Sequence, residues 1–190
     1  MEPTTRSYIA GFLDGDGSIF FQLIRKHDYR FGFQIRASVA FYQKTDNARI
    51  LQWLKDQLVS GSIRQRRTGI SDYTIVGANE VRRVLTELEP YVVLKREHVS
   101  LGLEILGALP TADPLHFLML CRRVDRFRDL NYSKTRTITS DVVERHFKLN
   151  GLLESRLGGE VAEPPPAVLT PWVRTTGDRL RSDQSEQSGP

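Results

Sequence analysis

The chain has 190 residues, of which 39% are hydrophobic and 26% are charged, which is typical of a soluble globular protein with one ordinary core. No apolar run approaches the ~20 residues of a membrane-spanning helix, and no leader peptide precedes Tyr8. The lone Cys121 excludes an internal disulfide and a thiolate metal site. We therefore expect an intracellular protein without membrane association.

The net charge of +4 is unevenly distributed. Residues 1–150 carry 23 basic and 17 acidic side chains, whereas residues 151–190 carry 4 and 6. The excess favours a nucleic-acid partner, although mild excesses also occur in proteins without one. The 21 Arg against 6 Lys suggest a GC-rich genome, which favours the bacterial cytoplasm over a chloroplast or mitochondrion. The basic residues concentrate at Arg25, Lys26, Arg30, Arg36, Lys44, Arg49, Arg64, Arg66 and Arg67.

The first half of the chain alternates between helical and strand periodicity. A helix is expected before Asp14, and alternation of apolar and polar residues predicts strands. Thr45 or Asp46 is expected to cap the helix that follows the second strand. The predicted strands are 18–26, 33–43, 62–67 and 70–76, with a polar turn at 27–30 and helices near 50–58 and 79–89.

The later part of the chain reads as helical as far as residue 150. A helix spans 96–109, Pro114 opens the next helix as a first-turn proline, and Ser140 is expected to cap the last one. The order αββαββα predicts an α+β fold, an antiparallel sheet with helices on one face and extra C-terminal helices. Residues 1–150 form the predicted domain, and residues 151–190, rich in Gly, Pro, Ser and Gln, a disordered tail.

An acidic segment, Asp14-Gly15-Asp16-Gly17-Ser18, follows the first apolar stretch. It can be read simply as a helix that ends in a glycine-rich turn. A calcium loop of the EF-hand type fails on spacing, because the sixth position is Ile19 and the twelfth is Arg25 instead of Gly and Glu.

Two glycines give this segment a third interpretation. Gly11 and Gly15 lie four residues apart and share a helix face, although each costs roughly 0.8–1 kcal/mol relative to Ala. Close approach of a second helix would account for them. If that helix comes from a second copy, two Asp16 carboxylates converge at the negative ends of two helices. Such a pair of carboxylates can hold Mg²⁺ for phosphodiester cleavage.

The segment YIAGFLDGDGS at residues 8–18 resembles the motif of the LAGLIDADG homing endonucleases. The likeness covers about residues 6–148 and points to the single-motif, homodimeric type. It implies a site-specific double-strand DNA endonuclease with an intron-borne gene, a long pseudo-palindromic target, Mg²⁺ or Mn²⁺ as cofactor, and no small-molecule substrate. Four later segments continue it in order: FYQKTDNARIL, RQRRTGISDY, LEPYVVLKREHVSL and LNYSKTRTITS.

The resemblance assigns roles to a few positions. Asp16 corresponds to the metal-binding carboxylate, and the Gly15 carbonyl to a secondary ligand. Gln43 and Lys95 correspond to residues that order water and stabilise charge at the scissile phosphate. Asn47 departs from the family, which often places a basic residue there. The predicted dimer interface comprises Tyr8, Gly11, Phe12 and Gly15.

DNA contacts are expected from the uncovered face of the sheet, because a β-ribbon fits the major groove. Lys134 and Arg136, in a late polar loop, are predicted phosphate contacts, and Tyr29 is expected to reach the outermost bases. The base-facing positions, taken from strand alternation, are Gln22, Ile24, Lys26, Asp28, Gln34, Arg36, Ser38, Ala40, Arg64, Arg66, Asp72 and Thr74.

Two alternatives belong to other functional classes. A non-catalytic relative, such as a maturase or a transcriptional regulator, would tend to lose the catalytic carboxylate, whereas Asp16, Gln43 and Lys95 are all present. A structural α+β protein with a tight helix dimer would not explain the polar face of the sheet. Replacing Asp16 by Asn discriminates among the three.

Overall fold

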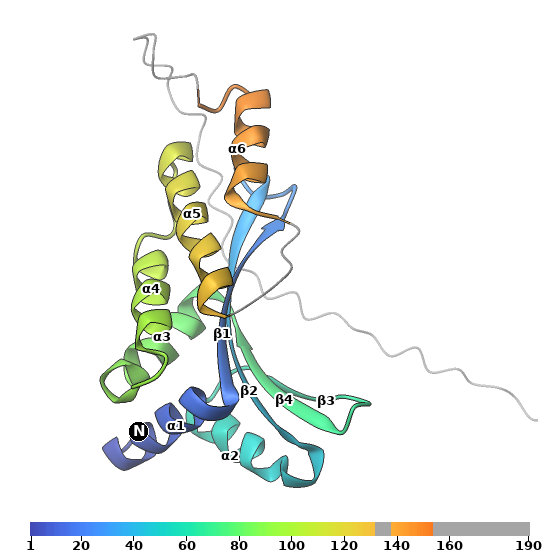
Figure 1. Ribbon diagram of the computed structural model, residues 1–190, viewed down its shortest axis with the longest axis vertical. Coiled ribbons are helices and arrows are strands. Elements are labelled where there is room, and N and C mark those ends of the chain that lie inside the picture. The colour runs from blue at the N-terminus through green and yellow to red at the C-terminus, as the bar shows by residue number, and fades with distance from the viewer. Residues whose placement is uncertain (132–137, 154–190) are drawn as a thin grey trace, which may run out of the picture. The chain divides into compact units, whose positions relative to one another are not determined.

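The computed structural model describes residues 1–131 and 138–153 (Figure 1). The predicted αββαββα order is confirmed, and three further helices follow it. The elements are α1 (Pro3–Asp16), β1 (Gly17–Arg25), β2 (Phe33–Lys44), the 3-10 helix η1 (Thr45–Asn47), α2 (Arg49–Leu58), β3 (Ser62–Gln65), β4 (Ile70–Val76), α3 (Ala78–Leu88), the 3-10 helix η2 (Glu89–Tyr91), α4 (Arg96–Gly107), α5 (Pro114–Leu130) and α6 (Ser140–Leu149).

The four strands form one antiparallel sheet in the order β1-β2-β4-β3. Gly17 pairs with Phe41 and Arg25 with Phe33, so β1 and β2 form a long hairpin. Strand β4 runs alongside the second half of β2, from Ser38 to Lys44. The end of the sheet where β1 begins therefore also holds the end of β2 and the C-terminus of α1.

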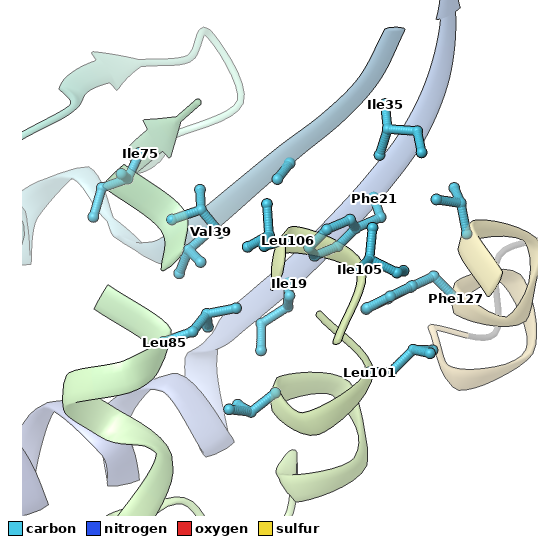
Figure 2. Close-up of a cluster of buried hydrophobic side chains, with 14 of the residues drawn as sticks. Ile19, Phe21, Ile35, Val39, Ile75, Leu85, Leu101, Ile105, Leu106 and Phe127 are labelled. Atoms are coloured by element: carbon cyan, nitrogen blue, oxygen red, sulfur yellow. The ribbon is translucent and has the colours of Figure 1, made fainter. Parts of the chain in front are cut away.

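The core lies between one face of the sheet and helices α3, α4 and α5, which Figure 1 shows along one side of the strands. Figure 2 shows Phe21 of β1 among Ile105 and Leu106 of α4 and Phe127 of α5. The Phe21 and Phe127 rings stack with centroids 4.6 Å apart. Alternate residues of the strands are consequently left on the uncovered face.

The turn predicted at 27–30 is confirmed, and strand β1 ends at Arg25, one residue before its predicted end. Asp28 lies in this turn, so the strand alternation does not extend to it as expected. An apolar residue follows the turn directly. Phe31 is buried against Phe117 and Phe147 at ring distances of 5.2 and 5.6 Å, and this contact fixes the tip to the C-terminal helices.

Two predicted helix caps are wrong, and one helix start is confirmed. Thr45 and Asp46 lie in η1 and do not cap α2, which begins at Arg49. Ser140 is inside α6, and its backbone N–H donates to Asp125 Oδ2 at 2.9 Å. Pro114 opens α5 as expected, and the Asp113 side chain accepts from the Leu115 N–H.

A close approach positions the acidic segment. A Cβ on Gly17 would lie 2.7 Å from the Leu13 backbone, so only glycine allows the chain to pass directly from α1 into β1. This places Asp16 at the junction of helix and sheet. Within the described residues, no helix is long and apolar enough to cross a membrane. The tail predicted as disordered lies outside the described residues from 154 onward.

Candidate active site and DNA-binding face

Asp16 is the last residue of α1, and its side chain is exposed. Within residues 1–131 and 138–153, its carboxylate makes no hydrogen bond or ion pair. It lies at the negative end of the helix dipole, where the last carbonyl groups lack helical partners. A free carboxylate at this position is suited to a cation.

Four hydrogen bonds join Asp14 to residues 93–95, and two of them are with Lys95. The Asp14 carboxylate accepts from the backbone N–H groups of Val93, Leu94 and Lys95 at 2.8, 3.0 and 2.9 Å. The Lys95 ammonium donates in turn to the Asp14 backbone oxygen at 2.5 Å. These bonds place Lys95 beside the C-terminus of α1, two residues from Asp16.

The two charged groups of this contact have shifted pKa values. Burial raises the pKa of Asp14, but the three backbone N–H groups and the Lys95 charge outweigh it, so the net shift is downward. Burial lowers the pKa of Lys95, and the negative charges of Asp14 and Asp16 oppose this shift. The Asp16 carboxylate is thus within electrostatic range of the Lys95 ammonium.

Gln43 lies at the same end of the sheet, but its side chain makes no hydrogen bond to Asp16 or Lys95. It is two residues beyond Phe41, the register partner of Gly17, and its side-chain oxygen accepts from the Lys44 N–H at 2.8 Å. Asn47 is exposed in η1. The structure therefore brings Asp16 and Lys95 together and leaves Gln43 nearby on the sheet.

The groups at this junction fit a divalent metal only in part. No cluster of three or more His, Cys, Asp or Glu side chains suited to a metal occurs among the described residues. Asp14 is unsuited as a ligand, since both of its oxygens accept backbone N–H groups. One chain therefore offers Asp16 and the exposed Gly15 carbonyl, hard oxygen donors of the kind that Mg²⁺ prefers. The set is completed if a second chain supplies the same groups.

The uncovered face of the sheet is polar. Gln22 and Arg36 are exposed and are register partners across β1 and β2. Ile24, Gln34, Ser38 and Thr74 are half-buried on the same face. Ala40, predicted to face the bases, is only 2% exposed and offers almost no surface to a ligand.

Asp72 does not project from this face as predicted. It is 3% exposed, and its Oδ1 accepts from Arg66 Nε at 2.6 Å and from Arg64 at 3.4 Å. Its Oδ2 accepts from the Thr74 hydroxyl at 3.1 Å. Asp72 therefore orients the two arginines instead of offering acceptors to DNA.

Tyr42 belongs to this cluster, although strand alternation alone gave it no role. The Arg66 guanidinium lies over its ring, 5.8 Å from the centroid. Asp72 accepts from Nε, and within the described residues no hydrogen bond engages the terminal nitrogens of Arg66. The feature that places Tyr42 in this cluster is its pairing with Asp72 across β2 and β4, and strand pairing cannot be read from a single sequence.

The remaining predicted contacts lie at the tip of the hairpin or beyond the described residues. Tyr29 accepts from the Gln34 side chain at 2.8 Å, so the turn is tied to the strand face. Lys26 and Asp28 are exposed. Lys134 and Arg136 fall within 132–137, outside the described residues.

The predicted dimer face of α1 is open. Tyr8, Gly11 and Gly15 are exposed, and Phe12 is half-buried. A Cβ on either Gly11 or Gly15 would meet nothing within 4 Å, so this chain by itself does not require glycine at these positions. Beside them lies a groove of about 370 Å³ lined by Thr4, Thr5, Tyr8, Ile50 and Trp53.

Comparison with known proteins assigns the family. The LAGLIDADG endonuclease family model matches residues 9–101. The chain is 38% identical over 138 residues to the DNA endonuclease I-CreI of Chlamydomonas reinhardtii, covering 72% of this chain and 84% of that protein. This chain belongs to the LAGLIDADG endonuclease family. Its fold and its expected resemblance are thereby confirmed.

A second relative of this LAGLIDADG protein is the DNA endonuclease I-CvuI of Chlorella vulgaris, 34% identical over 146 residues that cover 76% of this chain and 91% of that protein. Its crystal structure with its target in the presence of Ca superposes with a TM-score of 0.74, covering 78% and 95% of the two chains at 32% identity. The archaeal intron-encoded I-Vdi141I, at 18% identity and a TM-score of 0.69, shares the fold. The two curated relatives come from green algae, so the bacterial host suggested by the Arg-rich composition is not supported.

Proposed function

We propose that this chain is a site-specific double-strand DNA endonuclease that acts as a homodimer and hydrolyses phosphodiester bonds with Mg²⁺. The observation that carries the proposal is the position of Asp16. This carboxylate is exposed at the end of α1, beside the Lys95 ammonium, in a chain whose open sheet face carries arginines. I-CreI and I-CvuI are named DNA endonucleases, and two crystal structures of I-CvuI contain a DNA target, one in the presence of Ca and one, with the DNA not cleaved, in the presence of Mg.

The active-site chemistry follows from the donors at the junction. Asp16 and the Gly15 carbonyl hold the metal, and Mn²⁺ substitutes for Mg²⁺ because it accepts the same oxygen ligands. When bound, a divalent cation polarises the phosphate and lowers the pKa of bound water. Lys95 stabilises the negative charge that develops on the phosphate, and Gln43 orients water from the end of β2.

The face of α1 supports the dimer. Nothing within one chain requires glycine at positions 11 and 15, because a Cβ at either would meet no atom within 4 Å. Close packing of two α1 helices would explain both glycines. Tyr8, 53% exposed and in edge contact with Trp53 at 5.4 Å, extends this face. Two copies related by a twofold axis bring two Asp16 side chains together, so the target is long and pseudo-palindromic.

DNA recognition is proposed for the open sheet face. Arg66 reads guanine through its terminal nitrogens, and Gln22, Gln34 and Arg36 contact further bases in the major groove. Ile24, Ser38, Arg64 and Thr74 line the same surface. Lys26, Asp28 and Tyr29 lie at the outer end of the hairpin, and Lys134 and Arg136 contact phosphates.

The setting of the protein follows from its substrate. Such a nuclease acts inside a cell or an organelle, where its DNA lies, and the algal relatives agree with this. Only the excess of Arg over Lys favours bacterial cytoplasm. A non-catalytic DNA-binding role is disfavoured, since Asp16 is exposed and Lys95 lies beside it.

A library of palindromic DNA with randomised half-sites tests the function. The wild-type protein with Mg²⁺ is expected to cut a small set of related sequences, and sequencing the ends gives the target. Chelation by EDTA should abolish cutting, and Mn²⁺ should restore it. Selective retention of DNA without cutting would favour the non-catalytic alternative.

A further inference from the structure

We propose that Asp14, the other aspartate of the motif, is a positioning residue that fixes Lys95 at the active site. The inference rests on the proposed nuclease function, in which Lys95 stabilises the phosphate. Asp14 does not touch DNA or metal in this account. It acts by holding the turn that carries Lys95.

The contact works in both directions between α1 and the start of α4. The Asp14 side chain binds three successive backbone N–H groups, ending with that of Lys95. Successive amides of this kind form a concave anion-binding site. The Asp14 carbonyl lacks a partner within the helix because it lies at the end of α1, and it accepts a hydrogen bond from the Lys95 ammonium. The backbone N–H and the side-chain ammonium of Lys95 therefore both donate hydrogen bonds to Asp14.

Packing contributes little to this turn. Val93 and Leu94 are 77% and 74% exposed, so neither side chain anchors the segment. The nearest buried side chains are Val92 before it and Val99, one helical turn into α4. Between them, the Lys95 carbonyl accepts from the Val99 N–H at 3.0 Å, and the hydrogen bonds to Asp14 hold the backbone N–H groups and the ammonium. Loss of the carboxylate would let the turn, and with it the ammonium, shift.

The assignment gives the two aspartates different tasks. Asp14 has both oxygens engaged as acceptors of backbone N–H groups. Asp16, two residues later, has its carboxylate exposed. Replacing either one should therefore abolish or slow cleavage for different reasons.

A double-mutant cycle tests this inference on the DNA that the wild-type protein selects from the randomised library. The variants are Asp14→Asn, Lys95→Met and the double variant, with cleavage measured at saturating protein. A misplaced active-site group can cost about a hundredfold in rate, so Asp14→Asn is expected to slow cleavage about tenfold to a hundredfold. In the Lys95→Met background the same change should cost less than about twofold. Additive losses would overturn the inference.

A second measurement is independent of cleavage. Hydrogen exchange of the Val93, Leu94 and Lys95 amides should be slow in the wild type and fast in Asp14→Asn, with affinity for the same DNA in Ca²⁺ unchanged. Unchanged protection of these amides would contradict the inference. The matched control is Asp113→Asn, because Asp113 also accepts a backbone N–H, from Leu115 at the start of α5. This variant should cleave normally.

A variant that leaves α1 untouched covers the case in which Asp14→Asn does not fold. Val93→Pro deletes one of the three N–H donors, and the extended backbone of Val92 (φ −77°, ψ 134°) suits a residue before proline. It should slow cleavage in the wild-type background but not in Lys95→Met. Equal slowing in both would overturn the inference. A wild-type protein that cuts no DNA would instead refute the proposed function.

Discussion

At the scale of single residues, Asp72 organises the part of the sheet that we propose reads DNA. Its Oδ1 binds Arg66 at 2.6 Å, while Arg64 is held more weakly at 3.4 Å. A fixed guanidinium loses less conformational freedom on binding a base than a mobile one. Arg66 is therefore expected to discriminate more strongly than Arg64.

Arg66→Ala tests this ranking. A bidentate arginine–guanine contact contributes base discrimination of about tenfold or more, so the variant should accept other bases at one position of each half-site. Competition binding against single-base variants of the selected target measures it. The control is Arg67→Ala in the neighbouring turn, which should weaken binding evenly across sequences. An equal loss of base discrimination in both variants would show that Arg66 does not recognise a specific base.

Asp72 also makes folding stability depend on pH. Burial raises its pKa, but hydrogen bonds from Arg66 and Thr74 and the arginine charges lower it below 3.8 overall. A carboxyl with a depressed folded pKa contributes stability above its unfolded pKa, and this is lost as pH falls below about 4. Asp72→Asn should thus be about 1–3 kcal/mol less stable at pH 7 and lose less stability on acidification.

Urea unfolding at pH 7 and pH 3 measures both effects of Asp72→Asn. Asp56→Asn serves as the control, since Asp56 is an exposed carboxylate that accepts from Gln52 at 2.8 Å. That variant should follow the wild type at both pH values. An identical acid response in Asp72→Asn and the wild type would show that the buried cluster is not the source.

At the scale of elements, α1 has two roles: its end carries Asp16, and its exposed face carries the glycines. Gly11→Ala should stabilise the isolated helix by about 1 kcal/mol, because Ala is the better helix former. It should nevertheless convert the dimer to a monomer and abolish cleavage, since the added methyl keeps two helices apart.

Light scattering coupled to gel filtration, together with a cleavage assay, checks the Gly11→Ala prediction. Gly107→Ala is the matched control, because Gly107 is also exposed near a helix end and a Cβ there meets nothing within 4 Å. It should remain dimeric and active. If the Gly11→Ala variant is still dimeric and still cleaves DNA, the dimer interface lies on another surface.

The elements followed from sequence wherever the chain has one strong periodicity. Strand β2, with its apolar residues at every second position, and α5, opened by Pro114, lie where they were expected. The cap at Ser140 was wrong because a tertiary partner, Asp125, takes its backbone N–H. The burial of Phe31 beside the predicted turn could not be foreseen, because the helices that bury it are distant in sequence.

The site residues also divide into those predictable from local sequence and those that depend on distant contacts. Asp16 could be predicted because the motif is local, and Lys95 only through the family resemblance. That Asp72 is buried beneath two arginines, and that Asp14 binds the turn before α4, depend on contacts between residues up to 81 positions apart. Alternation along a strand gives the face of a residue but not whether its neighbours cover it, as Ala40 shows.

At the scale of the whole molecule, the described part of each chain offers one available carboxylate at the end of α1, an arginine-bearing sheet face and an exposed face of α1. A complete nuclease therefore needs two copies, and everything proposed converges on Asp16. In the proposed mechanism, Gln22, Arg36 and Arg66 contact the DNA, Asp14 positions Lys95, and α1 packs against the second chain.

Asp16→Asn is the most direct measurement of this account. The substitution preserves shape and removes only the charge that holds the metal. We expect it to lose detectable cleavage of the selected target in Mg²⁺, while affinity for the same DNA and the dimer mass match the wild type. Cleavage that persists in this variant would contradict the proposed active site.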